Sequence, residues 1–115
     1  MRNRKDILQD LLRCENPAEI NSLRAELGAF EWDTDERLIT LMPENIVHIL
    51  QRYIKGEISA KEVERWADAL DMREDVDMEE TAYVITELAN PVTPLTLESA
   101  ESLISEIDTS RALPT

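Results

Sequence analysis

The acidic side chains in the second half of this chain are the residues best able to do chemistry, because carboxylates can hold cations, transfer protons or attract a basic surface. Residues 66–115 contain twelve Asp and Glu against two arginines, which is −10 of the chain's net charge of −13. Residues 1–30 balance at five acidic and five basic side chains. Solubility alone does not require such confinement of charge to one half of the chain.

Helical spacing gathers these carboxylates around one aromatic residue. In a helix over about 60–72, acidic residues recur three and four positions apart on the outer face. The next helix continues the stripe and carries a tyrosine on its outer side, and exposed tyrosines often anchor protein interfaces. We predict that this acidic face binds a basic protein partner, although charged faces can also serve solubility alone. The predicted acidic face comprises Glu64, Asp68, Asp71, Asp75, Glu79, Glu80, Tyr83 and Glu87.

Two acidic runs begin like calcium-binding loops, but neither continues as one. The run that starts at Asp75 places Glu80 where the loop needs glycine for its sharp turn, and Thr86 where it needs a bidentate glutamate. The run that starts at Asp33 has Leu38 at the glycine position. We therefore predict no dedicated metal site and no cofactor, with weak carboxylate binding of a metal as an alternative.

Side chains typical of catalytic centres are few and isolated. The single histidine, His48, falls opposite the apolar arc of its expected helix, with no second His or Cys nearby in the sequence. No P-loop, dinucleotide fingerprint, nucleophile elbow or zinc motif occurs. Because one titrating group alone does not make a catalytic constellation, we predict that the protein is not an enzyme.

The overall composition indicates which kinds of partner the protein can bind and in which cellular compartment it is expected. The net charge of −13 repels nucleic-acid backbones. No stretch approaches the ~18 apolar residues that a membrane span needs. A lone cysteine, Cys14, excludes an intrachain disulfide and is consistent with a reducing compartment. We expect a cytoplasmic protein that binds neither nucleic acid directly nor a membrane.

The elements that must position these residues are helices. With only two glycines and apolar residues at helical spacing, the chain predicts an all-α fold, a compact bundle of five or six amphipathic helices. A single domain is expected over residues 1–107, followed by a flexible tail over 108–115. The expected helices cover about 4–14, 17–27, 41–55, 60–72, 77–89 and 97–107.

The helix near 41–55 is expected at the centre, because its apolar arc is wide enough to contact several neighbours. Ser59 and Glu62 form a capping box for the next helix, which should pair with it as an antiparallel hairpin and bury Trp66. Asp75 or Asp77 is expected to cap the helix over 77–89. Phe30 and Trp32 are expected to fill the core from a structured loop.

Several short patterns between residues 32 and 91 carry a family resemblance. They are Trp32-Asp33, Tyr53–Ala60, Trp66-Ala-Asp-Ala-Leu70, Arg73-Glu-Asp-Val76 and Leu88-Ala-Asn-Pro91. In these patterns the chain resembles a family of small bacterial helical proteins of uncharacterised function. The resemblance implies a bacterial cytoplasmic origin and a compact helical domain, and it supplies no activity. In size, charge and architecture only, the chain also looks like small acidic immunity proteins.

Two kinds of function therefore compete with enzymatic or metal-dependent roles. The first is a protein-interaction domain that binds a basic partner, with neutralisation in the manner of immunity proteins or antitoxins as its sharpest form. The second is a structural or regulatory subunit that forms a homodimer through an apolar face left over when the bundle closes. An exposed acidic patch with an aromatic anchor would favour the first of these.

Overall fold

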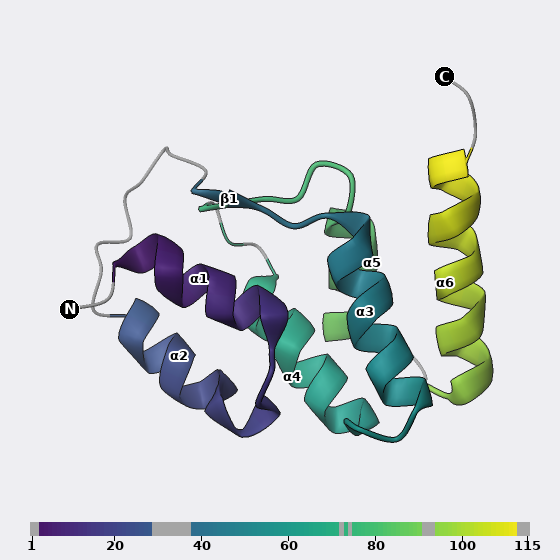
Figure 1. The fold of residues 1–115 in the computed structure, drawn as a ribbon, viewed down its shortest axis with the longest axis horizontal. Coiled ribbons are helices and arrows are strands. Elements are labelled where there is room, and N and C mark those ends of the chain that lie inside the picture. The colour runs from purple at the N-terminus through teal and green to yellow at the C-terminus, as the bar shows by residue number, and fades with distance from the viewer. Residues whose placement is uncertain (1–2, 29–37, 72, 74, 91–93, 113–115) are drawn as a thin grey trace.

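The computed structural model describes residues 3–28, 38–71, 73, 75–90 and 94–112 (Figure 1). This part of the chain contains six α-helices, one short 3-10 helix and two short strands, and it confirms the all-α fold. The elements are α1 (Arg4–Arg13), η1 (Pro17–Glu19), α2 (Ile20–Leu27), β1 (Ile39–Thr40), α3 (Pro43–Ile54), α4 (Ala60–Leu70), β2 (Val76–Asp77), α5 (Ala82–Ala89) and α6 (Leu97–Ala112).

Helices α3 and α4 occupy the middle of the bundle. Figure 1 shows α1 and α2 side by side at one end and α6 at the other, with α3 next to α6 and α5 behind α3. Helix α4 contacts α2, α3 and α5, whereas α3 contacts α4 and α6. The prediction that the helix near 41–55 is central is therefore confirmed by α3, and α4 is central as well. On either side of residues 55–59, α3 and α4 run in opposite directions, as expected.

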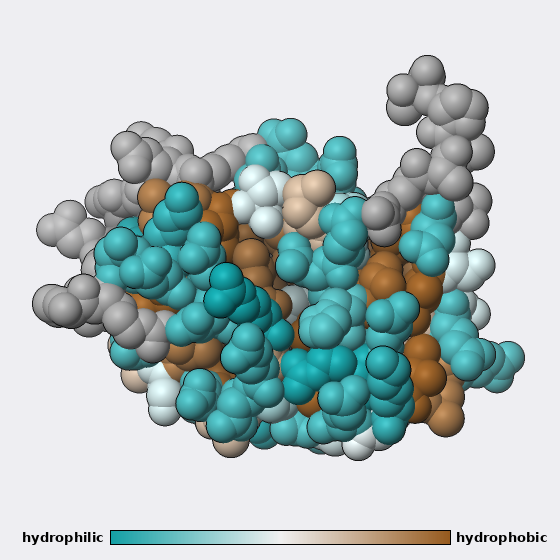
Figure 2. Space-filling view, in the orientation of Figure 1, coloured by the Kyte–Doolittle hydropathy of each residue, from teal (hydrophilic) through white to brown (hydrophobic). Residues whose placement is uncertain are grey.

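The core forms where the apolar faces of these helices meet. The Trp66 side chain is fully buried, and its indole Nε1 donates to the Leu11 carbonyl oxygen at 2.8 Å, so α4 is fastened to α1. Leu50 is also fully buried, as the spacing predicted. Helix α6 packs against α3 through Ala100, Leu103 and Ile107. Hydrophobic atoms are still visible in the seam between these two helices in Figure 2.

Helix ends follow the local signals in the sequence. The Ser59 hydroxyl accepts from the Glu62 amide at 3.1 Å, and the Glu62 carboxylate accepts from the Ser59 amide at 2.9 Å, which confirms the capping box. Gly56 follows α3 with φ +81°, a conformation that side chains other than glycine adopt at a cost. The α4 helix ends at Leu70, two residues before the predicted end.

The prediction for the fifth helix was wrong at its start. Residues Val76 and Asp77 form β2, which pairs in parallel with β1, and α5 begins at Ala82 rather than at 77. The backbone carbonyls of Asp75 and Asp77 accept from the Leu38 and Leu41 amides at 2.8 and 2.9 Å. Thr81 occupies the N-cap position of α5, so neither aspartate caps that helix. This strand pairing joins segments far apart in the sequence, so no local pattern announced it.

Other boundaries and orientations also differ from the predictions. Helix α6 continues to Ala112, so residues 108–112 extend the helix instead of starting a tail. Helical spacing groups Leu97 with the buried residues of α6, yet Leu97 is 54% exposed in the first turn. Spacing likewise groups Ala82 with the buried residues of α5, yet Ala82 is exposed. The loop prediction for Phe30 and Trp32 lies outside the described residues. In the part of the chain that is described, no helix has both the length and the apolar character to cross a membrane.

Candidate functional site

Three carboxylates of the predicted acidic face, those of Asp68, Asp71 and Asp75, contact other parts of the fold, and the others are at the surface. The Asp68 carboxylate accepts from Arg24 Nη1 at 3.2 Å, which links α4 to α2. The Asp71 carboxylate accepts from the Thr86 hydroxyl at 3.1 Å and from the Asn90 amide at 3.5 Å. Asp71 thus ties the end of α4 to α5.

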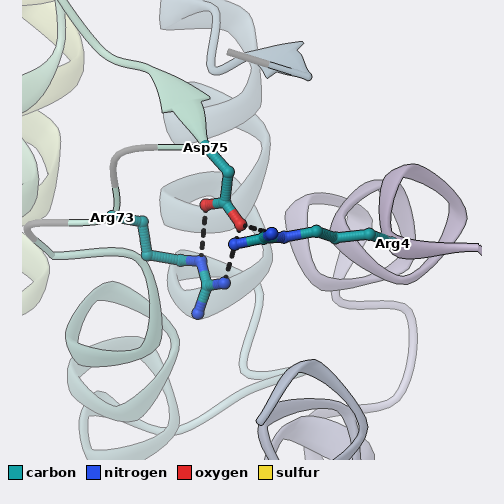
Figure 3. Close-up of polar contacts among 3 residues, drawn as sticks. All are labelled: Arg4, Arg73 and Asp75. Carbon is teal, nitrogen blue, oxygen red and sulfur yellow. Dashed lines mark hydrogen bonds and ion pairs between the residues drawn. The ribbon is translucent and has the colours of Figure 1, made fainter. Parts of the chain in front are cut away.

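Asp75 was wrongly placed on the exposed face, because its side chain is only 1% exposed. Figure 3 shows its carboxylate between two guanidinium groups, one from the neighbouring Arg73 and one from Arg4, which is 71 residues away in the sequence. Arg73 donates from Nε to Oδ1 and from Nη2 to Oδ2, each at 2.8 Å. Arg4 of α1 donates from Nε to Oδ2, also at 2.8 Å. The three side chains form a joint between α1 and the segment that leads into β2.

The charge of Asp75 is favoured by this arrangement. Burial alone raises the pKa of the carboxyl, but the hydrogen bonds and charges of Arg73 and Arg4 lower it more, so the pKa lies below its ordinary value of 3.8. The carboxylate is therefore ionised at neutral pH and fully occupied by the two arginines. It is a structural group and is not available to a partner.

The remaining predicted residues are at the surface. Tyr83 is 57% exposed on α5, and Glu87, one turn later, shares its side of the helix. Glu79 and Glu80 are exposed in the turn that precedes α5. Glu64 on α4 is 39% exposed. The structure thus brings Tyr83 and Glu87 together on α5, and it brings Glu64 and Glu87 together in a groove.

This groove has a volume of about 860 Å³ and lies between the start of α4, the end of α5 and one side of α6. We call it the α4–α6 groove. Its apolar lining consists of Ala60, Val63, Leu88, Pro94, Leu95 and Leu103. Val63, Leu88 and Leu103 are almost fully buried, so most of the accessible apolar surface comes from Ala60, Pro94 and Leu95. Its polar lining consists of Lys61, Glu64, Glu87, Asn90, Thr96, Glu98, Ser99, Ser102 and Glu106.

The α4–α6 groove is negatively charged. Four of its described lining residues are glutamates and one is a lysine, so the formal charge of the lining is −3. Lys61 contacts Glu64 at 3.9 Å while remaining 85% exposed, a pairing too loose to add much stability. Within the described residues, the carboxylates of Glu87, Glu98 and Glu106 make no ion pair or hydrogen bond. The groove therefore presents carboxylates that no described side chain neutralises.

Residues that could support catalysis do not converge on this groove. His48 is exposed on α3 and does not line it. Cys14 is buried at the end of α1, and burial, opposed by the charge of Arg52 and reinforced by that of Glu62, raises the pKa of its thiol to about 11. At neutral pH this thiol carries almost no thiolate, which is its nucleophilic form.

The described residues also show no metal centre. No three His, Cys, Asp or Glu side chains in this part of the chain are grouped so that they could hold a metal ion. The glutamates of the groove come from three different helices. The alternative of weak metal binding by carboxylates gains no support from their arrangement.

Comparisons of the chain with protein-family models, curated proteins and solved structures found no match. The site must therefore be interpreted from its own geometry. Sequence reasoning missed the contribution of α6, although Glu98, Ser102 and Glu106 were recognisable from their four-residue spacing as one polar side of that helix. Helical spacing could not show that this side faces α4 and α5 across a groove.

Proposed function

We propose that this chain is a non-enzymatic, cytoplasmic interaction domain that binds a basic protein partner through the α4–α6 groove and the adjoining outer side of α5. The observation that supports this proposal best is the combination of apolar lining residues with four glutamates and one lysine. Apolar surface supplies short-range affinity, and uncompensated carboxylates select cationic partners. Neutralisation of such a partner, as immunity proteins and antitoxins do, is the sharpest form of the proposal.

Tyr83 extends this surface beyond the groove. It is 57% exposed and lies one turn from Glu87, which lines the groove, so a partner seated there can reach both side chains. A tyrosine buries a large apolar area on binding and keeps a hydroxyl for hydrogen bonding. The net charge of −13 adds long-range attraction, which accelerates association with a cationic protein at low salt.

The structure changes which residues a test should replace. Asp68 and Asp71 already make polar contacts with α2 and α5, so reversing their charges would alter those contacts together with any binding surface. Tyr83→Ala combined with Glu87→Lys alters exposed side chains only. Leu97→Ala combined with Glu101→Lys is a matched control, since Leu97 is 54% exposed and Glu101 is exposed one turn later on α6, outside the groove.

The experiment is affinity capture from cells of the source, with partners identified by mass spectrometry and their association rates then measured with the purified proteins. Wild type and the Leu97→Ala/Glu101→Lys control should recover the same basic proteins, and the Tyr83→Ala/Glu87→Lys variant should lose them. Association with wild type should slow as salt is added. Equal recovery by all three proteins would refute the proposal, and a stable dimer in solution with no captured partner would favour the homodimer alternative.

A further inference from the structure

We propose that the partner fills the α4–α6 groove with an amphipathic helix whose apolar stripe is flanked on both sides by Lys or Arg, an inference that rests on the proposed function. The groove offers two kinds of surface that such a helix would match. Its apolar lining comes from Ala60 and Val63, from Leu88, from Pro94 and Leu95, and from Leu103, and its four glutamates come from the three helices α4, α5 and α6. Apolar anchors with cations on each flank are therefore complementary to it.

The backbone chemistry of the walls favours a helix over an extended peptide. The groove is lined by α4, α5, α6 and the connection at residues 94–96, so it is bordered mainly by helices, whose backbone groups are already hydrogen-bonded. An extended segment gains its backbone hydrogen bonds by pairing with a strand edge, and a groove made by helices offers none. A helix satisfies its own backbone and can bring a stripe of side chains to the apolar lining.

The spacing of charges on α6 sets the pattern that the occupant should carry. Glu98, Ser102 and Glu106 are four residues apart on the groove side of α6. At a rise of 1.5 Å per residue, Glu98 and Glu106 are about 12 Å apart along the helix axis. A bound helix that runs beside α6 would place cations opposite both glutamates if its Lys or Arg side chains were seven or eight residues apart.

The glutamates of α4 and α5 complete the pattern. Glu87 ends the α5 side, and Glu64 on α4 is held only by the 3.9 Å contact with the highly exposed Lys61. An incoming cation can replace that contact at little cost, because an exposed ion pair of this kind contributes little to stability. The occupant is thus expected to carry cations on the flank that faces α4 and α5 as well as on the flank that faces α6.

The test uses two synthetic peptides of about 14 residues, roughly four helical turns, made of the same leucines and lysines. In one peptide the leucines follow the helical spacing i, i+3, i+4, i+7, and in the other leucine and lysine alternate. Both peptides carry the same charge. Binding to the full chain is measured by calorimetry, and helix formation by circular dichroism. We expect the first peptide to bind at least about tenfold more tightly and to gain helical signal on binding.

Two variants of α6 locate the peptide. Ser102 is exposed and lines the groove, whereas Ser105 is exposed on the same helix outside it. Ser102→Arg adds bulk and positive charge inside the groove and should weaken binding of the helical peptide about tenfold or more, while Ser105→Arg should leave it within about twofold. Glu98→Lys combined with Glu106→Lys should weaken binding at least as much, and it serves as a second variant at exposed positions.

Several outcomes would overturn this inference. They are equal affinity for the two peptides, equal effects of Ser102→Arg and Ser105→Arg, and displacement of the helical peptide by spermidine at the same concentration of charge. The helix in the groove can also be wrong while the binding of a basic partner stands. In that case Ser102→Arg would still capture the natural partner that Tyr83→Ala/Glu87→Lys loses, which would place the partner on the outer side of α5 instead of in the groove.

Discussion

Carboxylates occur in two contrasting settings in this protein. The carboxylate of the Arg4–Arg73–Asp75 joint is buried and paired, whereas most carboxylates of the α4–α6 groove are exposed and, in the described part of the chain, unpaired. At the joint a single carboxylate is 1% exposed and receives three hydrogen bonds of 2.8 Å from two guanidinium groups. In the groove there are four glutamates and one lysine, and that lysine contacts Glu64 only loosely. Because carboxylates that hold a fold together become neutralised by their neighbours, those left without a counter-charge are the ones available to a partner.

The largest expected effect comes from removing the charge at the joint. Asp75→Asn keeps the shape of the side chain but removes the buried charge that receives hydrogen bonds from Arg4 and Arg73, which should lower the free energy of unfolding by about 3 kcal/mol. Asp68→Asn is the matched control, because the Asp68–Arg24 pair is 55% and 44% exposed and should contribute less than about 1 kcal/mol. Denaturant unfolding measures both, and equal losses would mean that Asp75 does not hold α1 in place.

The free energy of unfolding should also depend on pH through Asp75, with a smaller change than the Asp75→Asn substitution causes at neutral pH. The folded protein holds the pKa of Asp75 below 3.8, so the stabilisation from this group is complete above that value and is lost as the pH falls through the lowered pKa. The difference in unfolding free energy between wild type and Asp75→Asn should therefore be constant above about pH 5 and should shrink below about pH 4. A difference that grows on acidification would contradict the assigned direction of the shift.

The smallest expected effect is an increase in the free energy of unfolding when two groove carboxylates are removed. Glu98→Gln combined with Glu106→Gln removes two carboxylates that repel the other acidic groups of a chain with net charge −13. We expect the free energy of unfolding to rise by up to about 0.5 kcal/mol at low salt, and the gain to disappear near ~1 M salt because screening removes the repulsion. A loss of more than about 1 kcal/mol would show that these glutamates support the fold, and the contrast with Asp75 would not hold.

Local patterns were sufficient to predict the six helices and the capping box of α4, but they could not predict the start of α5 or the role of each carboxylate. The burial of Trp66 and Leu50 follows from helical periodicity, and the Ser59 capping box follows from its residue types. Asp75 was misassigned because its spacing suited a helix cap, whereas its partner Arg4 lies 71 residues away. Nothing near residue 75 encodes that contact.

The groove was missed for a related physical reason. The spacing of acidic residues shows which side of a helix is polar, and this was enough to place Tyr83 and Glu87 at the surface. It does not show whether two polar sides diverge into solvent or face each other. That depends on how α6 packs on α3 and how α5 packs on α4, which side chains distributed over the whole chain determine.

The long-range fastening of α1 has a consequence for how this protein folds during synthesis. Leu11 is joined to a tryptophan 55 residues later, and Arg4 to an aspartate 71 residues later. At roughly 5–20 residues per second, α1 is synthesised several seconds before either anchor has been translated. Its apolar side, which includes Leu8 and Leu11, has no complete core to enter during that interval. The contacts that join α1 to α4 and to Asp75 can therefore form only after α4 and residue 75 have been synthesised.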